Sequence, residues 1–180
     1  MLRKLLLVSM MVVAITVGCG AQEPETTTYT NSEFGYSITL IDPYTDVEEL
    51  NEKAEVRIGV SEGGKVQTVV HLMVIEGEEP FGSDELDASM ERLSEISEKR
   101  FPDLEVEFKI VSTSDLKLGS GQTARIQLQS LTVPDDCERH EYTLNVIHEG
   151  RLFHLMGMPC GDGSEIEVIK TIINSFSLSH

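Results

Sequence analysis

Apolar and polar residues alternate along much of the chain, and this period of two is typical of β-strands with one buried face. Residues 29–41 show it in Gly-Tyr-Ser-Ile-Thr-Leu and predict a strand pair. Residues 54–60 and 66–75 predict two more strands, joined by a hairpin turn in which Gly63 and Gly64 accept positive φ. The second of these strands is mostly apolar, so we expect it to be central and covered on both faces.

A helical period appears in two longer segments. Residues 83–100 place apolar side chains on one stripe, with Ser83 as a cap and Pro102 as a stop. The shorter segment 47–53 is expected to form one or two helical turns. The motif Ser164-Glu165-Ile166-Glu167 has the form of a capping box and opens a last helix. The apolar stripe of that helix comprises Ile166, Ile169, Ile172, Ile173 and Phe176.

The second half of the chain predicts two further hairpins. Their strands are expected at residues 105–114, 123–132, 138–148 and 151–158. Glycine-containing turns at 119–121 and at Glu149-Gly150 separate the members of each pair. The order of strands, helix, strands and helix predicts an α+β domain, with one mainly antiparallel β-sheet flanked by helices.

The chain begins with a predicted secretory signal peptide, residues 1–18. Arg3 and Lys4 form a basic start, an uncharged apolar run follows, and Gly18 is the small residue before the expected cleavage site. The apolar run is too short for a spanning helix, which needs about 20 apolar residues. The alternatives are an ordinary signal peptide followed by a chance cysteine, and a short membrane anchor.

The segment Ile15-Thr16-Val17-Gly18-Cys19 resembles the lipobox of bacterial lipoproteins, with Thr16 where that family prefers leucine. The resemblance implies cleavage before Cys19, a diacylglyceryl thioether on Cys19 and a further acyl chain such as palmitate. Two or three chains anchor firmly, at about 0.8 kcal/mol per buried methylene. Residues 19–28 would then be a lipidated flexible tether. Residues 29–180 would form a single domain in the bacterial cell envelope, outside the cytoplasm.

The composition is strongly acidic. Once the signal peptide is removed, the chain has 12 basic and 31 acidic side chains, which gives a net charge of −19 with histidine neutral. Nucleic-acid binding requires a basic footprint and is therefore excluded as a function. Flat docking on anionic lipid is disfavoured for the same reason. A basic protein partner is compatible with this charge, and so is a role in solubility alone.

Two further cysteines predict a disulfide. Cys137 and Cys160 flank the last predicted hairpin at nearly equal distances from its turn, which would place them opposite each other in an antiparallel ladder. Disulfides persist outside the cytoplasm. Closing this loop is worth roughly 3–3.5 kcal/mol in the chain-entropy model. The alternative is two free thiols in the core.

A competing interpretation of the same segment is a soft metal site. His154, Met156, Met158 and Cys160 occupy every second position and would share one face of a strand. Imidazole, thioether and thiolate groups suit Cu(I). Alternatively, the methionines fill the core and His154 is a hydrogen-bonded core histidine. Because a disulfide-bonded Cys160 cannot be a thiolate ligand, the disulfide and the copper site compete, and we assign no metal ligand.

No motif indicates catalysis. Two segments match nucleotide-binding motifs by residue type: Gly119–Ala124 matches a dinucleotide fingerprint, and Gly59–Lys65 matches a phosphate-binding loop. Each motif requires a helix to follow, but a predicted strand follows each segment here. No nucleophile elbow or zinc-protease motif is present in the sequence. We therefore expect no enzymatic activity, no catalytic residues and no cofactor.

The early strand Tyr36-Ser37-Ile38-Thr39-Leu40, a hairpin after the long helix, and the closing Ile172-Ile173-Asn174-Ser175-Phe176 resemble the PsbP/DcrB-like family. One difference is Ile41-Asp42-Pro43-Tyr44, where many members carry proline, glycine and tryptophan. The resemblance implies an α/β/α sandwich without shared catalytic residues. Members act by binding, as a photosystem subunit, nuclear transport factors, secretion chaperones and envelope lipoproteins.

These patterns predict a membrane-anchored envelope lipoprotein that serves as a non-catalytic binding or accessory module for another protein. One alternative is a lipoprotein that binds a small molecule or copper. Another is an inhibitor or immunity protein, whose acidic charge would meet a basic protein acting in the envelope.

Overall fold

The computed structural model of the chain describes residues 24–77, 80–82, 86–88, 107–132, 139–157, 159 and 165–179. The predicted signal peptide with Cys19 lies outside these residues. So do both members of the predicted disulfide, Cys137 and Cys160, and most of the predicted helix at 83–100. Within that predicted helix, residues 86–88 are described and are helical.

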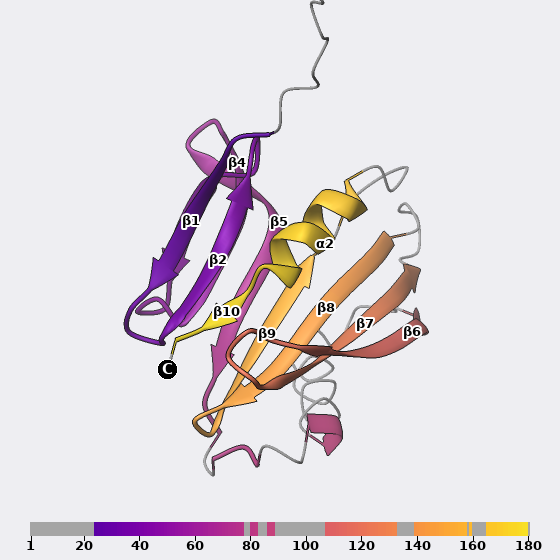
Figure 1. The fold of residues 1–180 in the computed structure, drawn as a ribbon. Coiled ribbons are helices and arrows are strands. Elements are labelled where there is room, and N and C mark those ends of the chain that lie inside the picture. Colours follow the sequence, from indigo (N-terminus) through magenta and orange to yellow (C-terminus); the bar gives the residue numbers. More distant parts are fainter. Residues whose placement is uncertain are drawn as a thin grey trace, which may run out of the picture.

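The largest element is an antiparallel sheet of seven strands in the order β3-β4-β5-β9-β8-β7-β6 (Figure 1). Its strands are β3 (Asp46–Leu50), β4 (Glu55–Glu62), β5 (Lys65–Ile75), β6 (Glu107–Lys117), β7 (Thr123–Thr132), β8 (Arg139–His148) and β9 (Arg151–Gly157). Two meanders, β3-β4-β5 and β6-β7-β8-β9, meet where β5 pairs with β9. The centre of the sheet therefore joins the two halves of the chain.

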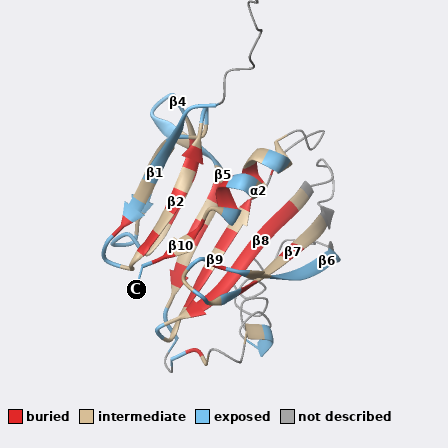
Figure 2. Ribbon diagram, in the orientation of Figure 1, coloured by how far each residue is buried: buried red, intermediate tan, exposed pale blue. Residues whose placement is uncertain are grey.

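A second layer covers one face of this sheet. It consists of the helix α2 (Ile166–Asn174) and a three-stranded antiparallel sheet of β1 (Thr26–Asn31), β2 (Tyr36–Ile41) and β10 (Ser177–Leu178), with β2 in the middle. Figure 2 shows the buried residues gathered along β2, α2, β9 and β8. The main hydrophobic core lies between the two layers.

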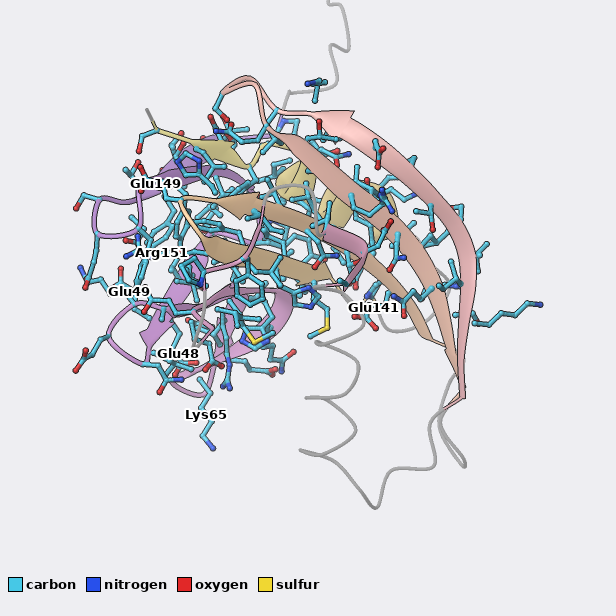
Figure 3. The ribbon with its side chains drawn as sticks, turned by 90° about the horizontal axis from the view of Figure 1, so that it is seen from below. Glu48, Glu49, Lys65, Glu141, Glu149 and Arg151 are labelled. Carbon is cyan, nitrogen blue, oxygen red and sulfur yellow. The ribbon has the colours of Figure 1, made fainter. Side chains whose placement is uncertain are left out.

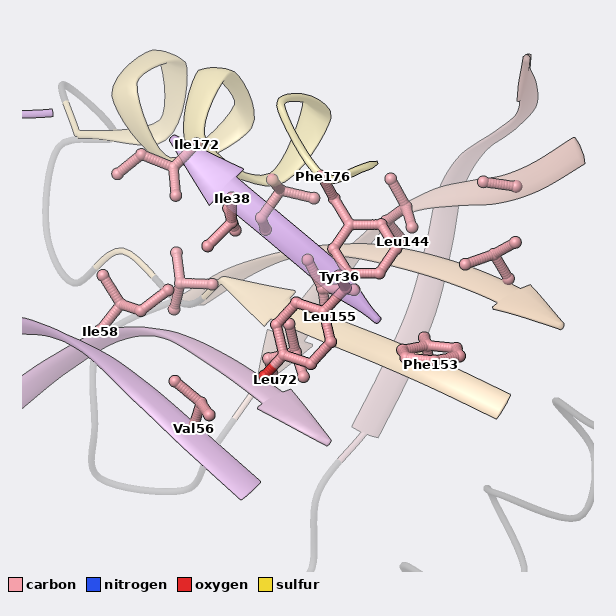
Figure 4. Close-up of a cluster of buried hydrophobic side chains, with 14 of the residues drawn as sticks. Tyr36, Ile38, Val56, Ile58, Leu72, Leu144, Phe153, Leu155, Ile172 and Phe176 are labelled. Atoms are coloured by element: carbon pink, nitrogen blue, oxygen red, sulfur yellow. The ribbon is translucent and has the colours of Figure 1, made fainter. Parts of the chain in front are cut away.

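Aromatic side chains join the layers of this core (Figure 4). Tyr36 of β2 packs edge-on against Phe153 of β9, with ring centroids 6.0 Å apart, and Phe176 lies 5.6 Å from Tyr36 and 5.7 Å from Phe153. Helix α2 approaches β9 closely because Gly157 has no side chain. A Cβ at Gly157 would overlap Cγ2 of Ile169 and lie 3.0 Å from Cδ1 of Ile173.

The sequence prediction of an α+β domain built on antiparallel β-structure and helix is confirmed. The predicted hairpins at Gly63-Gly64 and Glu149-Gly150 are also present, and all four of these residues have positive φ. The strands form two sheets, however, where one was expected, because the early pair β1-β2 packs over the main sheet and takes β10 as its third strand.

Two local predictions are wrong. Residues 47–53 do not form helical turns: Asp46–Leu50 is strand β3, and a turn with positive φ at Asn51, Glu52 and Lys53 follows it. Pairing with β4, which places Val47 opposite Ile58, overrides the local helical spacing.

The expected N-cap of the last helix, Ser164, is also wrong, and Ser164 itself lies outside the described residues. The N-cap of α2 is Glu165, without a side-chain capping hydrogen bond. The predicted apolar stripe is nevertheless correct, since Ile169, Ile172 and Ile173 are fully buried. None of the helices that the structure describes has the length and apolar character needed to cross a bilayer.

Candidate functional site

The face of the seven-stranded sheet that is turned away from α2 carries polar side chains at its centre. On β5, Val70, Leu72 and Val74 enter the core, so His71 and Met73 lie on the opposite face. The same alternation places the even-numbered residues of β9 and the odd-numbered residues of β8 on this opposite face. We call this surface the polar face.

The strand register arranges the polar face in two rows. One row runs Glu55–Met73–His154–Asn145 across β4, β5, β9 and β8. The next row runs Arg57–His71–Met156–Thr143 across the same strands. The two histidines and two methionines therefore alternate at the centre of the face, each histidine beside a methionine of the neighbouring strand.

Each histidine is held by a side chain of a flanking strand. His71 Nε2 lies 2.8 Å from a carboxylate oxygen of Glu55, and both side chains retain less than a fifth of their exposure. His154 Nδ1 lies 2.6 Å from Oδ1 of Asn145. Because that amide oxygen can only accept, Nδ1 of His154 carries the proton and Nε2 keeps its lone pair.

Burial gives two groups of this face unusual acidities. Burial, together with the nearby His71, lowers the pKa of His154 to about 4, so this ring is neutral at physiological pH. Burial raises the pKa of Glu141 to about 7. Figure 3 labels this side chain. A neutral imidazole can bind a metal or a hydrogen-bond donor, and a carboxyl group near its pKa can exchange a proton.

The sequence prediction brought two of these residues together. His154 and Met156 share the polar face, as expected from their spacing, whereas Met158 and Cys160 lie outside the described residues. Sequence reasoning missed His71 and Met73. The signal that could have found them is a repeated tripeptide, since His-Leu-Met occurs at 71–73 and again at 154–156.

A recess of about 380 Å³ lies between the β1–β2 turn, the β3–β4 turn and the start of β9. Its wall includes Arg151, whose Nε lies 2.7 Å from a carboxylate oxygen of Glu76 and whose guanidinium carbon lies 5.6 Å from the centroid of the Phe34 ring. Both contacts tie the start of β9 to neighbouring segments. The recess is therefore better explained as packing around this arginine than as an anion-binding pocket.

The seven-stranded sheet ends at β6, an eleven-residue strand. Ile110 is 58% exposed and Val111 is 54% exposed, and these are the large hydrophobic side chains that stand out at the surface among the residues described. Ile110 pairs with Gln129 and Ser112 with Leu128, so Val111 is the extra residue of a β-bulge. The bulge thus occurs where the two apolar side chains are most exposed.

Comparison with known proteins identifies the fold. No family model and no curated sequence matches the chain. Among solved structures, it is similar to cyanobacterial PsbP (CyanoP) of Synechocystis sp. PCC 6803, with 14% identity, a TM-score of 0.61, and coverage of 89% of this chain and 96% of that one. LpqN of Mycobacterium tuberculosis, described as involved in cell envelope biogenesis, is 12% identical with a TM-score of 0.49 and coverage of 87% and 91%.

The likeness to CyanoP shows that the chain has a PsbP-like fold. It agrees with the resemblance seen in the early strand of the sequence and in the closing Ile-Ile-x-Ser-Phe.

Proposed function

We propose that the chain is a bacterial envelope lipoprotein whose PsbP-like domain is a non-catalytic binding or accessory module for another protein. The observation that carries this proposal is the long edge strand β6 with exposed Ile110 and Val111. An edge strand presents N–H and C=O groups that an extended segment of a partner can pair with. Exposed apolar side chains beside these groups add hydrophobic contact area.

The charges along β6 favour a partner other than a second copy of the chain. Lys109 and Lys117 lie on this strand, and lysine on an edge strand disfavours pairing with an identical edge. The excess of acidic residues elsewhere would speed the encounter with a basic protein. A heterologous, extended segment therefore fits the β6 edge best, and the net charge of the whole domain favours a partner that is basic overall.

Replacement of Ile110 and Val111 by serine is expected to reduce partner recovery in a crosslinked pull-down from native membranes. Burial of each side chain in an interface is worth about 1.5–3 kcal/mol, so the double variant should bind at least roughly tenfold more weakly. Val66→Ser, in the β4–β5 hairpin, is the matched control, because it removes a partly exposed valine far from β6 in the strand order. Equal recovery by wild type and the double variant would eliminate the edge as the binding surface.

Membrane attachment through Cys19 is a separate part of the proposal. Cys19→Ser should abolish lipid attachment and leave an uncleaved or misprocessed precursor, because the thioether forms on the cysteine sulfur. Mass spectrometry of the mature amino terminus measures this directly. An unmodified residue other than Cys19 at that terminus would contradict the lipoprotein assignment.

A second candidate function, metal binding, is supported by the alternating histidines and methionines of the polar face. The residues that the structure describes add no observation in favour of the inhibitor alternative.

A further inference from the structure

We propose that the centre of the polar face is a binding site for Cu(I), with His71, Met73, His154 and Met156 as its four ligands. The site arises because two His-Leu-Met tripeptides pair antiparallel, with Leu72 opposite Leu155. Both leucines enter the core, so both histidines and both methionines lie together on the other face. The proposal goes beyond the protein-binding function and does not depend on it.

The register places the four side chains within reach of one ion. His71 is directly opposite Met156, and Met73 is directly opposite His154. Directly opposed residues have Cβ atoms about 4.5–5.5 Å apart, and alternate residues along one strand are roughly 6.6 Å apart. Side chains as long as histidine and methionine can converge above a patch of that size. All four residues keep part of their exposure, whereas Thr143 and Asn145 beside them on β8 are buried.

The hydrogen bonds of the two histidines fit the role of metal ligands. Glu55 holds Nε2 of His71 and leaves Nδ1 of that ring for the metal, while Asn145 holds Nδ1 of His154 and leaves Nε2. Metal-binding histidines usually donate their second ring N–H to a carboxylate or carbonyl group in this way, which fixes the ring and its tautomer. Glu55 on β4 and Asn145 on β8 thus orient the two rings from opposite sides.

The chemistry of the ligand set selects a soft monovalent ion. Thioether sulfur favours Cu(I), whereas calcium and magnesium prefer oxygen and structural zinc takes cysteine, histidine or carboxylate. Among the described residues, no three histidine, cysteine, aspartate or glutamate side chains cluster as a metal site. The two methionines would supply the remaining donors. Glu55 is also ion-paired with Arg57, at 3.4 Å, so its part in the site is to orient His71 and not to balance the charge of the ion.

Competition between the full mature chain in detergent and bicinchoninate, a chromophoric Cu(I) chelator, tests the site. Cu(I) is supplied with ascorbate under argon. Wild type should bind one Cu(I) per chain, and Met73→Leu should weaken binding at least about tenfold, which corresponds to 1.4 kcal/mol or more. Glu55→Gln should weaken it roughly 10- to 100-fold by loosening His71. Leucine conserves the volume of methionine, so thermal unfolding of the Met73→Leu variant should stay close to wild type.

The matched control is the triple variant Cys137→Ser/Met158→Leu/Cys160→Ser, in which no free thiol is left where a disulfide is predicted. It removes Met158 and Cys160 from the alternative set on one strand (His154, Met156, Met158 and Cys160) but leaves the cross-strand site complete, so Cu(I) affinity should be unchanged. Loss of binding in this control with retention in Met73→Leu would overturn the proposal in favour of the single-strand set. Failure of wild type to retain Cu(I) against the chelator would overturn it outright.

Discussion

Gly59→Ala is expected to destabilise the domain by about 3 kcal/mol or more, at the upper end of what overpacking costs. A Cβ at Gly59 would overlap the backbone oxygen of Gln67 and lie 2.8 Å from its carbonyl carbon. Both atoms belong to the backbone of the adjacent strand β5, so no rotamer change can relieve the clash. Strands β4 and β5 would have to separate at this point.

The glycine is required because the register shifts here. Ile58 pairs with Val70 but Gly59 pairs with Thr68, so Val69 is an extra residue and β5 is bulged at this point. The same bulge precedes His71 by two residues and helps to set its row on the polar face.

Chemical denaturation followed by circular dichroism measures the effect of Gly59→Ala. Gly119→Ala is the matched control, because a Cβ at Gly119 has no atom within 4 Å and its φ lies outside the left-handed region. The control should leave the free energy of unfolding within roughly 1 kcal/mol of wild type. A Gly59→Ala variant as stable as this control would show that the bulge can be remodelled at little cost.

Local pattern predicted most strands and hairpins of this domain because each depends on neighbouring residues. Alternation located β2, β5 and β7, and the paired glycines located the β4–β5 turn. Residues Asp46–Leu50 were mispredicted because their helical spacing is weaker than the backbone pairing that β4 offers. The pairing of β3 with β4 depends on tertiary structure, which the spacing of apolar residues within one segment does not specify.

The candidate copper site could also be predicted only in part from local pattern. Alternation within β9 correctly placed His154 and Met156 on one face. Their neighbours on β5, however, follow from the pairing of β5 with β9, which joins segments about 80 residues apart. Strand order depends on how two meanders dock through their shared core, and residue spacing within one strand carries no information on it. The repeated His-Leu-Met tripeptide becomes informative only once that docking is known.

The predicted disulfide between Cys137 and Cys160 and the lipid on Cys19 stay predictions, because all three residues lie outside the described ranges. The disulfide and the cross-strand copper site are compatible with each other. The earlier conflict arose only because Cys160 was counted as a ligand of the single-strand set.

Glu141→Gln is expected to gain roughly 3 kcal/mol of stability relative to wild type as pH rises from 4.5 to 8. Glu141 is 8% exposed, and burial raises its pKa from 4.5 to about 7. The folded state therefore holds this proton more tightly than the unfolded state does. The contribution is fully present below pH 4.5 and is lost as pH rises through about 7, by roughly 3 kcal/mol at 1.36 kcal/mol per pKa unit.

The contribution of His154 to stability depends on pH in the opposite direction and causes the loss of stability in acid. Its pKa falls from 6.5 in the unfolded chain to about 4 in the fold, so its contribution is present above pH 6.5 and is lost as pH falls toward 4. Between pH 4.5 and 6.5 the contributions of Glu141 and His154 change in opposite directions and cancel, so the stability of wild type should vary little there and fall slightly on either side. Glu141→Gln should move the optimum upward and leave the acid side, which His154 determines, unchanged.

Thermal unfolding of the two proteins from pH 4 to pH 9 measures this difference. Glu149→Gln is the matched control, since it removes a carboxyl group from the exposed turn that joins β8 to β9 and should keep the wild-type profile. Parallel profiles for wild type and Glu141→Gln above pH 5 would mean that the buried carboxyl group is solvated or paired when it ionises. The polar face would then carry two carboxylate charges, at Glu141 and at Glu55. Its preference for Cu(I) over a divalent ion would in that case come from the two thioether ligands alone.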